Sequence, residues 1–198
     1  MVLNKVRNQV KPLVDTIGRA LAKTGLPPTF WTIVGFLFSI IAGLLYATHS
    51  SQPYLAALAI ICSGIFDVVD GAAARVAQKV SRSGSFNDST LDRLAEVAIY
   101  SGIIYADYTY SLVVLLALAF SLLVSYTRAK GDSLSVTLSG VGIGERAERL
   151  LALGFFTIVG YVWIGVLVVL ALAAITFAQR YYAIMIKLSL PGANAAGN

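Results

Sequence analysis

Residues 54–77 read YLAALAIICSGIFDVVDGAAARVA, an almost unbroken apolar run that carries two aspartates near its end. The run is as long as the stretch of about 20 residues that a helix needs to cross a bilayer. It has no alternation of apolar and polar residues, the pattern typical of membrane barrels. Because a spanning segment must satisfy its backbone hydrogen bonds internally, the run predicts a membrane helix and an all-α integral membrane protein.

Similar apolar runs recur along the chain. Of the 198 residues, 58% are hydrophobic and 13% are charged, whereas soluble domains are roughly 45–50% apolar and about 25% charged. The runs predict six transmembrane helices, over residues 31–49, 54–77, 90–106, 109–127, 149–162 and 164–186. We therefore expect one transmembrane domain over residues 27–190.

The two ends differ from this pattern. Residues 1–26 place apolar side chains at helical spacing between basic ones, which predicts an amphipathic helix on the membrane surface, before the first span. Residues 191–198 are small and polar, and we expect them to form a disordered tail.

The basic residues gather on one side of the predicted spans. They are Lys5, Arg7, Lys11, Arg19, Lys23, Arg75, Lys79, Arg82, Arg93, Arg128, Lys130, Arg146, Arg149, Arg180 and Lys187. The opposite connections, 49–54, 105–110 and 160–165, contain none. Since short loops rich in Lys and Arg stay cytoplasmic, we expect a multi-pass protein of the cell membrane with both termini cytoplasmic. The net charge of +5 then indicates an anionic lipid surface as partner rather than a nucleic acid.

Four aspartates, Asp67, Asp70, Asp88 and Asp92, lie at the cytoplasmic ends of the second and third predicted spans. Each pair projects from one helix face, and a short connection predicts antiparallel helices whose acidic faces meet. A carboxylate in a membrane helix costs at least about 2.5 kcal/mol, so four converging ones require cations. Hard oxygen ligands favour Mg²⁺, Mn²⁺ or Ca²⁺. The alternative, a solvated loop without chemistry, fits less well because the acids have apolar neighbours.

Two glycines accompany the acids. Gly71 directly follows Asp70, and Gly84 lies one turn before Asp88. Without side chains, both would let a phosphate or nucleotide approach the backbone closely. Arg75 could pair with such a phosphate or with an aspartate.

The pattern Asp67-x2-Asp70-Gly71-x2-Ala74-Arg75, then eight residues and Gly84-x3-Asp88-x3-Asp92, resembles the signature of the CDP-alcohol phosphotransferase family. The resemblance implies that an alcohol hydroxyl attacks the lipid-bearing phosphate of a CDP-lipid and displaces CMP, with two Mg²⁺ or Mn²⁺ ions at the diphosphate. It implies that all four aspartates bind metal and that Asp92 also takes the hydroxyl proton, as the catalytic base. The residues that would touch the CDP-lipid are Pro28, Thr29, Phe30, Thr32, Gly71, Arg75, Ser81 and Gly84.

The stretches 125–130 and 144–150 are similar to those of phosphatidylinositol phosphate and archaetidylinositol phosphate synthases. This similarity implies inositol 1-phosphate as the acceptor, in phospholipid biosynthesis, and a homodimer is a further expectation from the family. An acceptor with its own phosphate needs a basic pocket. The candidates for that pocket are Arg128, Lys130, Arg146, Arg149 and Arg180. The polar segment 132–144 between the stretches could be a flap or a plain loop.

Other functions stay open at this point. Glycerol 3-phosphate as acceptor would use the same basic pocket, and either diacylglycerol or archaeol would suit the apolar surface. A six-helix protein with intramembrane acids could also be a cation transporter. Transporter acids usually lie near the bilayer midplane, whereas these cluster at one edge, which favours the enzyme.

Overall fold

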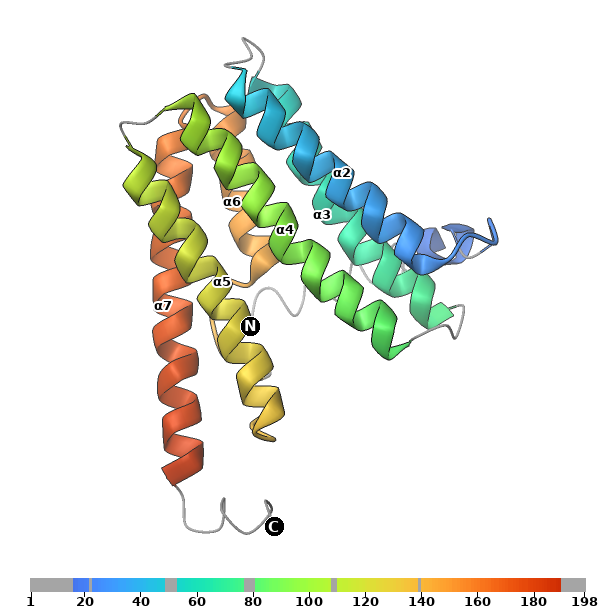
Figure 1. Ribbon diagram of the computed structural model, residues 1–198, viewed down its shortest axis with the longest axis vertical. Helices are drawn as coiled ribbons and strands as arrows, with labels where there is room; N and C mark the ends of the chain where they lie inside the picture. The colour runs from blue at the N-terminus through green and yellow to red at the C-terminus, as the bar shows by residue number, and fades with distance from the viewer. Residues whose placement is uncertain are drawn as a thin grey trace. The chain divides into compact units, whose positions relative to one another are not determined.

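The structure is a computed structural model, and it describes residues 16–21, 23–48, 53–76, 81–107, 110–138 and 140–189 (Figure 1). Every regular element in these ranges is a helix, which confirms the all-α prediction. After helical residues 16–21 the order is α2 (Pro28–Ala47), α3 (Pro53–Val76), α4 (Arg82–Ala106), α5 (Ser111–Ser133), α6 (Arg146–Ile158) and α7 (Val162–Ser189). Most of the predicted amphipathic helix, residues 1–15, and the whole predicted tail, 191–198, lie outside the described residues.

Four of the described helices are long and apolar enough to cross a membrane. They comprise Pro28–Ala47, Pro53–Ala72, Ser111–Ser133 and Val162–Ser189. The protein is therefore a multi-pass membrane protein. Two predicted spans fall short of these criteria for different reasons. The 13 residues of α6 extend only about 20 Å, less than the roughly 30 Å of a hydrocarbon core, and the first half of α4 carries several charged side chains.

The distribution of side chains on α2 is the reverse of that on a soluble helix. Its buried positions are small or polar residues, namely Thr32, Gly35, Ser39, Ala42, Gly43 and Tyr46. Its large aliphatic residues Ile33, Leu37, Ile41 and Leu44 are exposed. Small residues at helix contacts and large apolar ones facing outward are typical of a helix packed in lipid.

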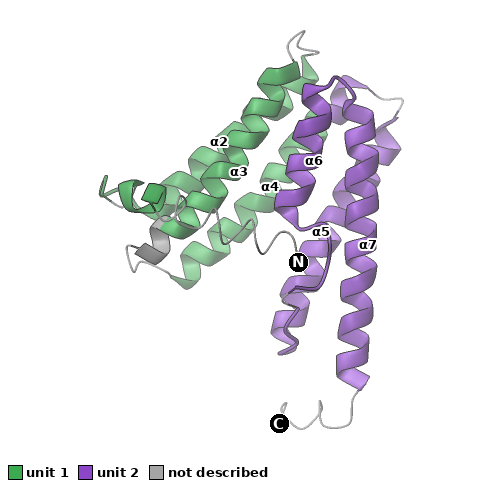
Figure 2. Cartoon of the chain, turned by 180° about the vertical axis from the view of Figure 1, so that it is seen from behind, with its two compact units in different colours: residues 1–102 green, residues 103–198 purple. Residues whose placement is uncertain are grey.

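The chain divides into two compact units, residues 1–102 and 103–198 (Figure 2). In the first unit, α2 and α3 run antiparallel side by side (Figure 1). The Ser39 and Ser63 hydroxyls join them through a buried 2.7 Å hydrogen bond. Against α4, a methyl group on Gly102 would collide with the backbone of Gly43. Close backbone approach therefore fixes α4, which carries Asp88, relative to its neighbours.

In the second unit, α7 packs against both α5 and α6. Its buried residues include Val166, Val169 and Ala173, followed toward the carboxyl end by Thr176 and Arg180. The packing thus changes from apolar to polar along one face of α7. The polar half of that face meets the segment that precedes α6.

Candidate active site

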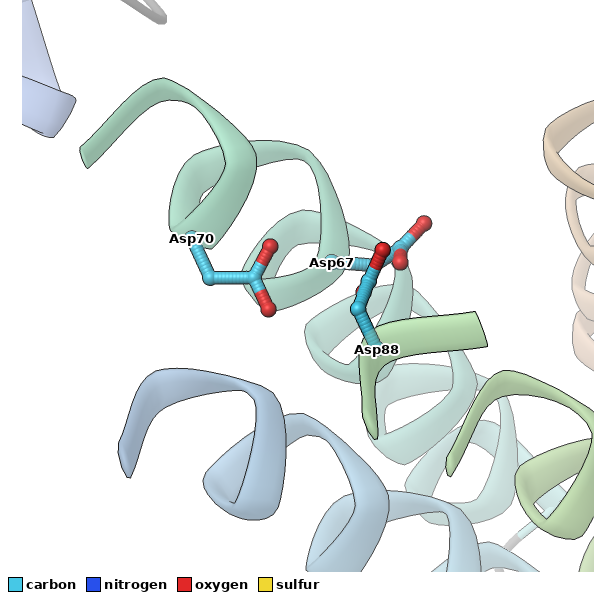
Figure 3. Close-up of side chains that lie close together, drawn as sticks. All are labelled: Asp67, Asp70 and Asp88. Carbon is cyan, nitrogen blue, oxygen red and sulfur yellow. The ribbon is translucent and has the colours of Figure 1, made fainter. Parts of the chain in front are cut away.

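Three carboxylates converge within the first unit. Asp67 and Asp70 lie one turn apart on α3, and Asp88 lies near the start of α4. One carboxylate oxygen from each residue lies within 4.8 Å of the other two. Figure 3 shows the Asp88 side chain beside those of Asp67 and Asp70. The face of α3 that carries Asp67 and Asp70 therefore meets α4 at Asp88, as their i, i+3 spacing predicts.

The start of α4 is fixed by a helix cap at Ser81, which was not among the predicted features. The Gly84 N–H donates to the Ser81 hydroxyl at 3.0 Å, and the Ser85 N–H donates to the Ser81 carbonyl at 3.0 Å. Serine is a preferred N-cap residue because its side-chain oxygen satisfies an amide that has no partner within the helix. Sequence could have indicated this cap, since Ser81 directly precedes the helix. The cap fixes where α4 begins and so places Asp88 in the second turn of the helix.

Asp92 lies one turn beyond Asp88 on α4 and is not one of the three convergent residues. Its Oδ2 atom is 4.0 Å from Nη1 of Arg93, and its side chain is 20% exposed. The spacing from Asp88 directs it to the same helix face. The structure thus brings three of the four predicted ligands together, and Asp92 is not among them.

The environment of Asp70 fits a cation. Asp70 is 4% exposed. Its carboxylate receives hydrogen bonds from the Thr32 hydroxyl and the Gly71 backbone N–H. Its Oδ2 atom is buried and accepts no hydrogen bond within the described part of the chain. A buried carboxylate oxygen beside two further carboxylates is costly without a positive charge, and an all-oxygen donor set suits a hard divalent ion.

Four of the predicted CDP-lipid contacts lie at the start of α2, namely Pro28, Thr29, Phe30 and Thr32. Thr32 is buried against Asp70, so this end of α2 borders the acidic group. Trp31 stacks on Phe66 of α3 with ring centroids 6.2 Å apart. Phe30 packs edge-on against Trp31 at 5.1 Å and is 42% exposed. The aromatic contacts anchor the end of α2 that carries Thr32.

The other predicted CDP-lipid contacts are Gly71, Arg75, Ser81 and Gly84. Gly71 lies beside Asp70 and hydrogen-bonds it. Ser81 and Gly84 form the α4 cap, so both lie within two turns of Asp88. Arg75 lies in the last turn of α3, and its side chain is outside the described part of the structure.

The second unit contains the five predicted phosphate-binding cations. Arg149 and Arg180 are 1% and 2% exposed. Lys130 and Arg128 are exposed near the end of α5, and Arg146, the first residue of α6, is half-buried. The structure therefore separates the five into two buried guanidinium groups and three more accessible cations.

Arg180 donates to three acceptors. Its Nε bonds the Val141 carbonyl at 3.0 Å and its Nη1 bonds the Val124 carbonyl at 3.0 Å. Its Nη2 lies 3.2 Å from Glu145 Oε1, which is also 3.8 Å from Nη1 of Arg128. Glu145, which is not one of the predicted site residues, thus joins two of the predicted cations. The only sequence signal for this contact was an acid within a basic stretch.

The segment between the basic stretches is packed in its described parts. Val136 and Leu138 are buried. Lys187 of α7 donates to the Thr137 carbonyl at 2.6 Å. Gly144 N–H donates to the Thr176 hydroxyl at 2.8 Å. The sequence left open whether this segment is a flap or a plain loop, and these contacts favour the plain loop.

Comparison with known proteins agrees with this geometry. The family model described as CDP-alcohol phosphatidyltransferase matches residues 26–179. Archaetidylinositol phosphate synthase of Pyrococcus horikoshii is 36% identical over 181 residues, 91% of this chain and 95% of the relative. The synthase of the same name from Methanothermobacter thermautotrophicus is 38% identical over 185 residues, 90% of this chain and 92% of the relative.

Solved structures of Mycobacterium tuberculosis phosphatidylinositol phosphate synthase share the fold. The complex with manganese and citrate superposes with a TM-score of 0.77 at 26% identity, covering 91% of each chain. The structure with CDP-DAG bound gives a TM-score of 0.74 at 26% identity and covers 92% of this chain and 96% of the other. The chain therefore belongs to the CDP-alcohol phosphatidyltransferase family and is a membrane-embedded transferase of phospholipid synthesis.

Proposed function

We propose that the protein transfers a phosphatidyl-type group, diacylglycerol phosphate or archaeol phosphate, from a CDP-lipid to a hydroxyl of inositol 1-phosphate and releases CMP. The observation that carries the proposal is the convergence of Asp67, Asp70 and Asp88 within 4.8 Å. Its support includes two relatives that are archaetidylinositol phosphate synthases. A similar structure has CDP-DAG bound.

Divalent metal belongs to this reaction. Asp67, Asp70, Asp88 and Asp92 would hold two Mg²⁺ or Mn²⁺ ions, and the manganese in a similar structure supports this donor set. When bound, such ions neutralise the diphosphate and stabilise the negative charge that passes to CMP. Burial of Asp70 and its hydrogen bond from Thr32 hold one ligand in a fixed orientation.

Asp92 is the proposed catalytic base. The acceptor hydroxyl oxygen bonds to the lipid-bearing phosphorus, the bond from that phosphorus to the CMP oxygen breaks, and the hydroxyl proton passes to the Asp92 carboxylate. Asp92 suits this step because it lies one turn from Asp88 and its side chain is 20% exposed. It can therefore meet a substrate as well as the convergent group.

The CDP-lipid would bind beside the acids, at the start of α2 and the α4 cap. Thr32 and Gly71 already contact Asp70, and Ser81 and Gly84 lie within two turns of Asp88. Pro28, Thr29, Phe30 and Arg75 complete this proposed set. A glycine-flanked backbone permits close approach of the diphosphate, and Arg75 supplies a charge-assisted contact.

The acceptor phosphate would bind to the basic group of the second unit, formed by Arg128, Lys130, Arg146, Arg149 and Arg180. A phosphate dianion would complement these cations through charge-assisted hydrogen bonds. Serine or free inositol would gain nothing from such a group. The basic group therefore supports an acceptor that carries its own phosphate.

We also propose the membrane arrangement that the sequence predicts. Residues 27–190 form a catalytic domain of six spans, with α4 and α6 as its shorter or more polar members. An amphipathic surface helix precedes it, and a tail follows over residues 191–198. Both termini and the active site face the cytoplasm, and the protein forms a homodimer. Cysteine labelling at positions 49–52 and 77–80 from either side of sealed vesicles tests the orientation.

The test of the reaction is CMP release by purified protein. We expect turnover with CDP-lipid, Mg²⁺ and inositol 1-phosphate, and none with free inositol or serine. Running CDP-diacylglycerol and CDP-archaeol side by side identifies the lipid. Turnover with glycerol 3-phosphate alone would refute the acceptor assignment. Metal-dependent ion flux without CMP release would refute the proposed transfer reaction and favour a cation transporter.

A further inference from the structure

Thr176 holds the segment that leads into α6. It is fully buried on α7. Its hydroxyl oxygen accepts the Gly144 N–H at 2.8 Å and the Ile143 N–H at 3.3 Å. Buried threonines in helices commonly bond a carbonyl of their own helix, whereas this oxygen serves two amides about thirty residues away in the chain. We propose that Thr176 is a positioning residue for the acceptor, because it fixes Gly144 and through it Arg149.

Close packing shows that the segment lies directly on α7. Gly142 has a φ of +115°, and a methyl group there would lie 2.5 Å from Thr176 Cγ2. A methyl group on Gly144 would lie 2.8 Å from Leu172 Cβ and 2.9 Å from the Leu172 carbonyl oxygen. Leu172, Thr176 and Arg180 are four residues apart, so they form one face of the helix. The Gly142 and Gly144 backbone therefore lies directly against the side chains of that face.

The contact passes from Thr176 to Arg149 through one residue. Gly144 donates its N–H to Thr176 and accepts Arg149 Nη1 on its carbonyl at 2.8 Å. Both polar groups of Gly144 are therefore engaged on defined partners. Arg149 is 1% exposed, so its guanidinium has little freedom to find another orientation. Loss of the Thr176 oxygen would release the carbonyl that orients Arg149.

The same segment carries Glu145, the N-cap residue of α6. Its carboxylate meets Arg180 at 3.2 Å and Arg128 at 3.8 Å. A shift of Gly144 would therefore displace two pairs of charges at once. This inference rests on the proposed function, in which Arg128, Arg149 and Arg180 bind the acceptor phosphate. Preorganisation of such cations lowers the cost of binding.

The decisive variants are Thr176→Val, which keeps the side-chain shape and removes the oxygen, and Thr176→Ser, which keeps the oxygen. We expect T176V to raise the KM for inositol 1-phosphate by about tenfold, because two buried amides lose their acceptor. The kcat and the KM for CDP-lipid should stay within about twofold of wild type. T176S should restore the acceptor KM.

Thr157→Val is the matched control. Thr157 is also fully buried, and its hydroxyl donates to the Leu153 carbonyl of its own helix at 2.7 Å. T157V should leave both KM values unchanged. An unchanged acceptor KM in T176V, a uniform loss for both substrates, or failure of T176S to restore the KM would overturn the proposal. If T176V does not fold, Thr176→Cys replaces it, since sulfur is a weak acceptor.

Inorganic phosphate separates this proposal from the acceptor assignment. Phosphate should raise the Tm of the purified wild-type protein. T176V should need about tenfold more phosphate for the same rise in Tm. If the wild type turns over only glycerol 3-phosphate, the inositol assignment fails, while a raised KM for glycerol 3-phosphate in T176V still supports Thr176. Equal stabilisation of both proteins by phosphate would overturn the role of Thr176 even if inositol 1-phosphate is the acceptor.

Discussion

Replacing Asp70 by Asn removes one negative charge from the convergent acidic group and preserves the shape of the side chain. Asp70 is 4% exposed, and its oxygen lies within 4.8 Å of an oxygen of Asp67 and of Asp88. Two unit charges at 4.8 Å repel by about 3.5 kcal/mol at an effective dielectric constant of 20. Because Asp67 and Asp88 are partly exposed, solvent screening lowers the repulsion energy of each pair to roughly 2 kcal/mol.

The substitution should therefore have opposite effects without and with metal. In EDTA, D70N should unfold roughly 8–16 °C above wild type, since removing two repulsions gains about 4 kcal/mol and each kcal/mol shifts Tm by roughly 2–4 °C at this chain length. With Mg²⁺, wild type should gain stability through binding to the folded state. D70N should gain almost no stability from Mg²⁺. Loss of a residue that merely orients a metal ligand costs about 10–100-fold in activity. Because Asp70 is itself a proposed ligand, CMP release by D70N should fall by more than about a hundredfold.

Thermal unfolding of purified protein in EDTA and in a Mg²⁺ series measures both effects, with CMP release as the activity assay. Asp107→Asn is the control, because Asp107 is an exposed carboxylate just after α4, and it should leave all three measurements unchanged. If D70N is less stable than wild type in EDTA and keeps the Mg²⁺ stabilisation, the convergent carboxylates do not form a metal site.

Three further predictions concern the same unit. Asp92→Asn should nearly abolish CMP release while CDP-lipid binding, measured by retention of labelled lipid, stays close to wild type; equal loss of both would contradict its role as base. Ser81→Ala should lower the free energy of unfolding by about 1 kcal/mol through loss of the cap. Ser81→Asn keeps a capping side chain and should restore stability. A raised KM for CDP-lipid in Ser81→Asn would then report a contact of Ser81 with the nucleotide. Gly102→Ala should lower Tm, because the methyl group meets the Gly43 backbone and overpacking costs about 1–3 kcal/mol; Gly64→Ala, with open space around it, should not.

Helix boundaries illustrate what local pattern can predict. The apolar run placed the third span at 90–106, whereas α4 begins at Arg82. Hydropathy misses this first part because its residues are polar and its start is set by the Ser81 cap. The fifth run was expected at 149–162, and α6 covers Arg146–Ile158 instead. Gly160, with a φ of +80°, ends that helix earlier than composition alone suggests.

The acidic group could be predicted because helical periodicity connects spacing to geometry. Residues three or four apart share a face, and a short connection brings two such faces together. The spacing predicted that Asp92 would join the group, whereas only Asp67, Asp70 and Asp88 converge within 4.8 Å. The sequence also did not indicate that Thr32, more than thirty residues away, would bond Asp70. These contacts depend on how α2 and α4 approach α3, which buried glycines and serines decide.

By itself the sequence determined the solvent, the fold class and the acidic chemistry of this protein, because each follows from composition or from spacing within one helix. Only the tertiary structure decided which basic residues are buried and what holds them. Arg180 bonds Val141, Val124 and Glu145, and Thr176 bonds Ile143 and Gly144. Their partners lie 32 or more residues away, and no local pattern encodes a contact that forms when separate helices pack.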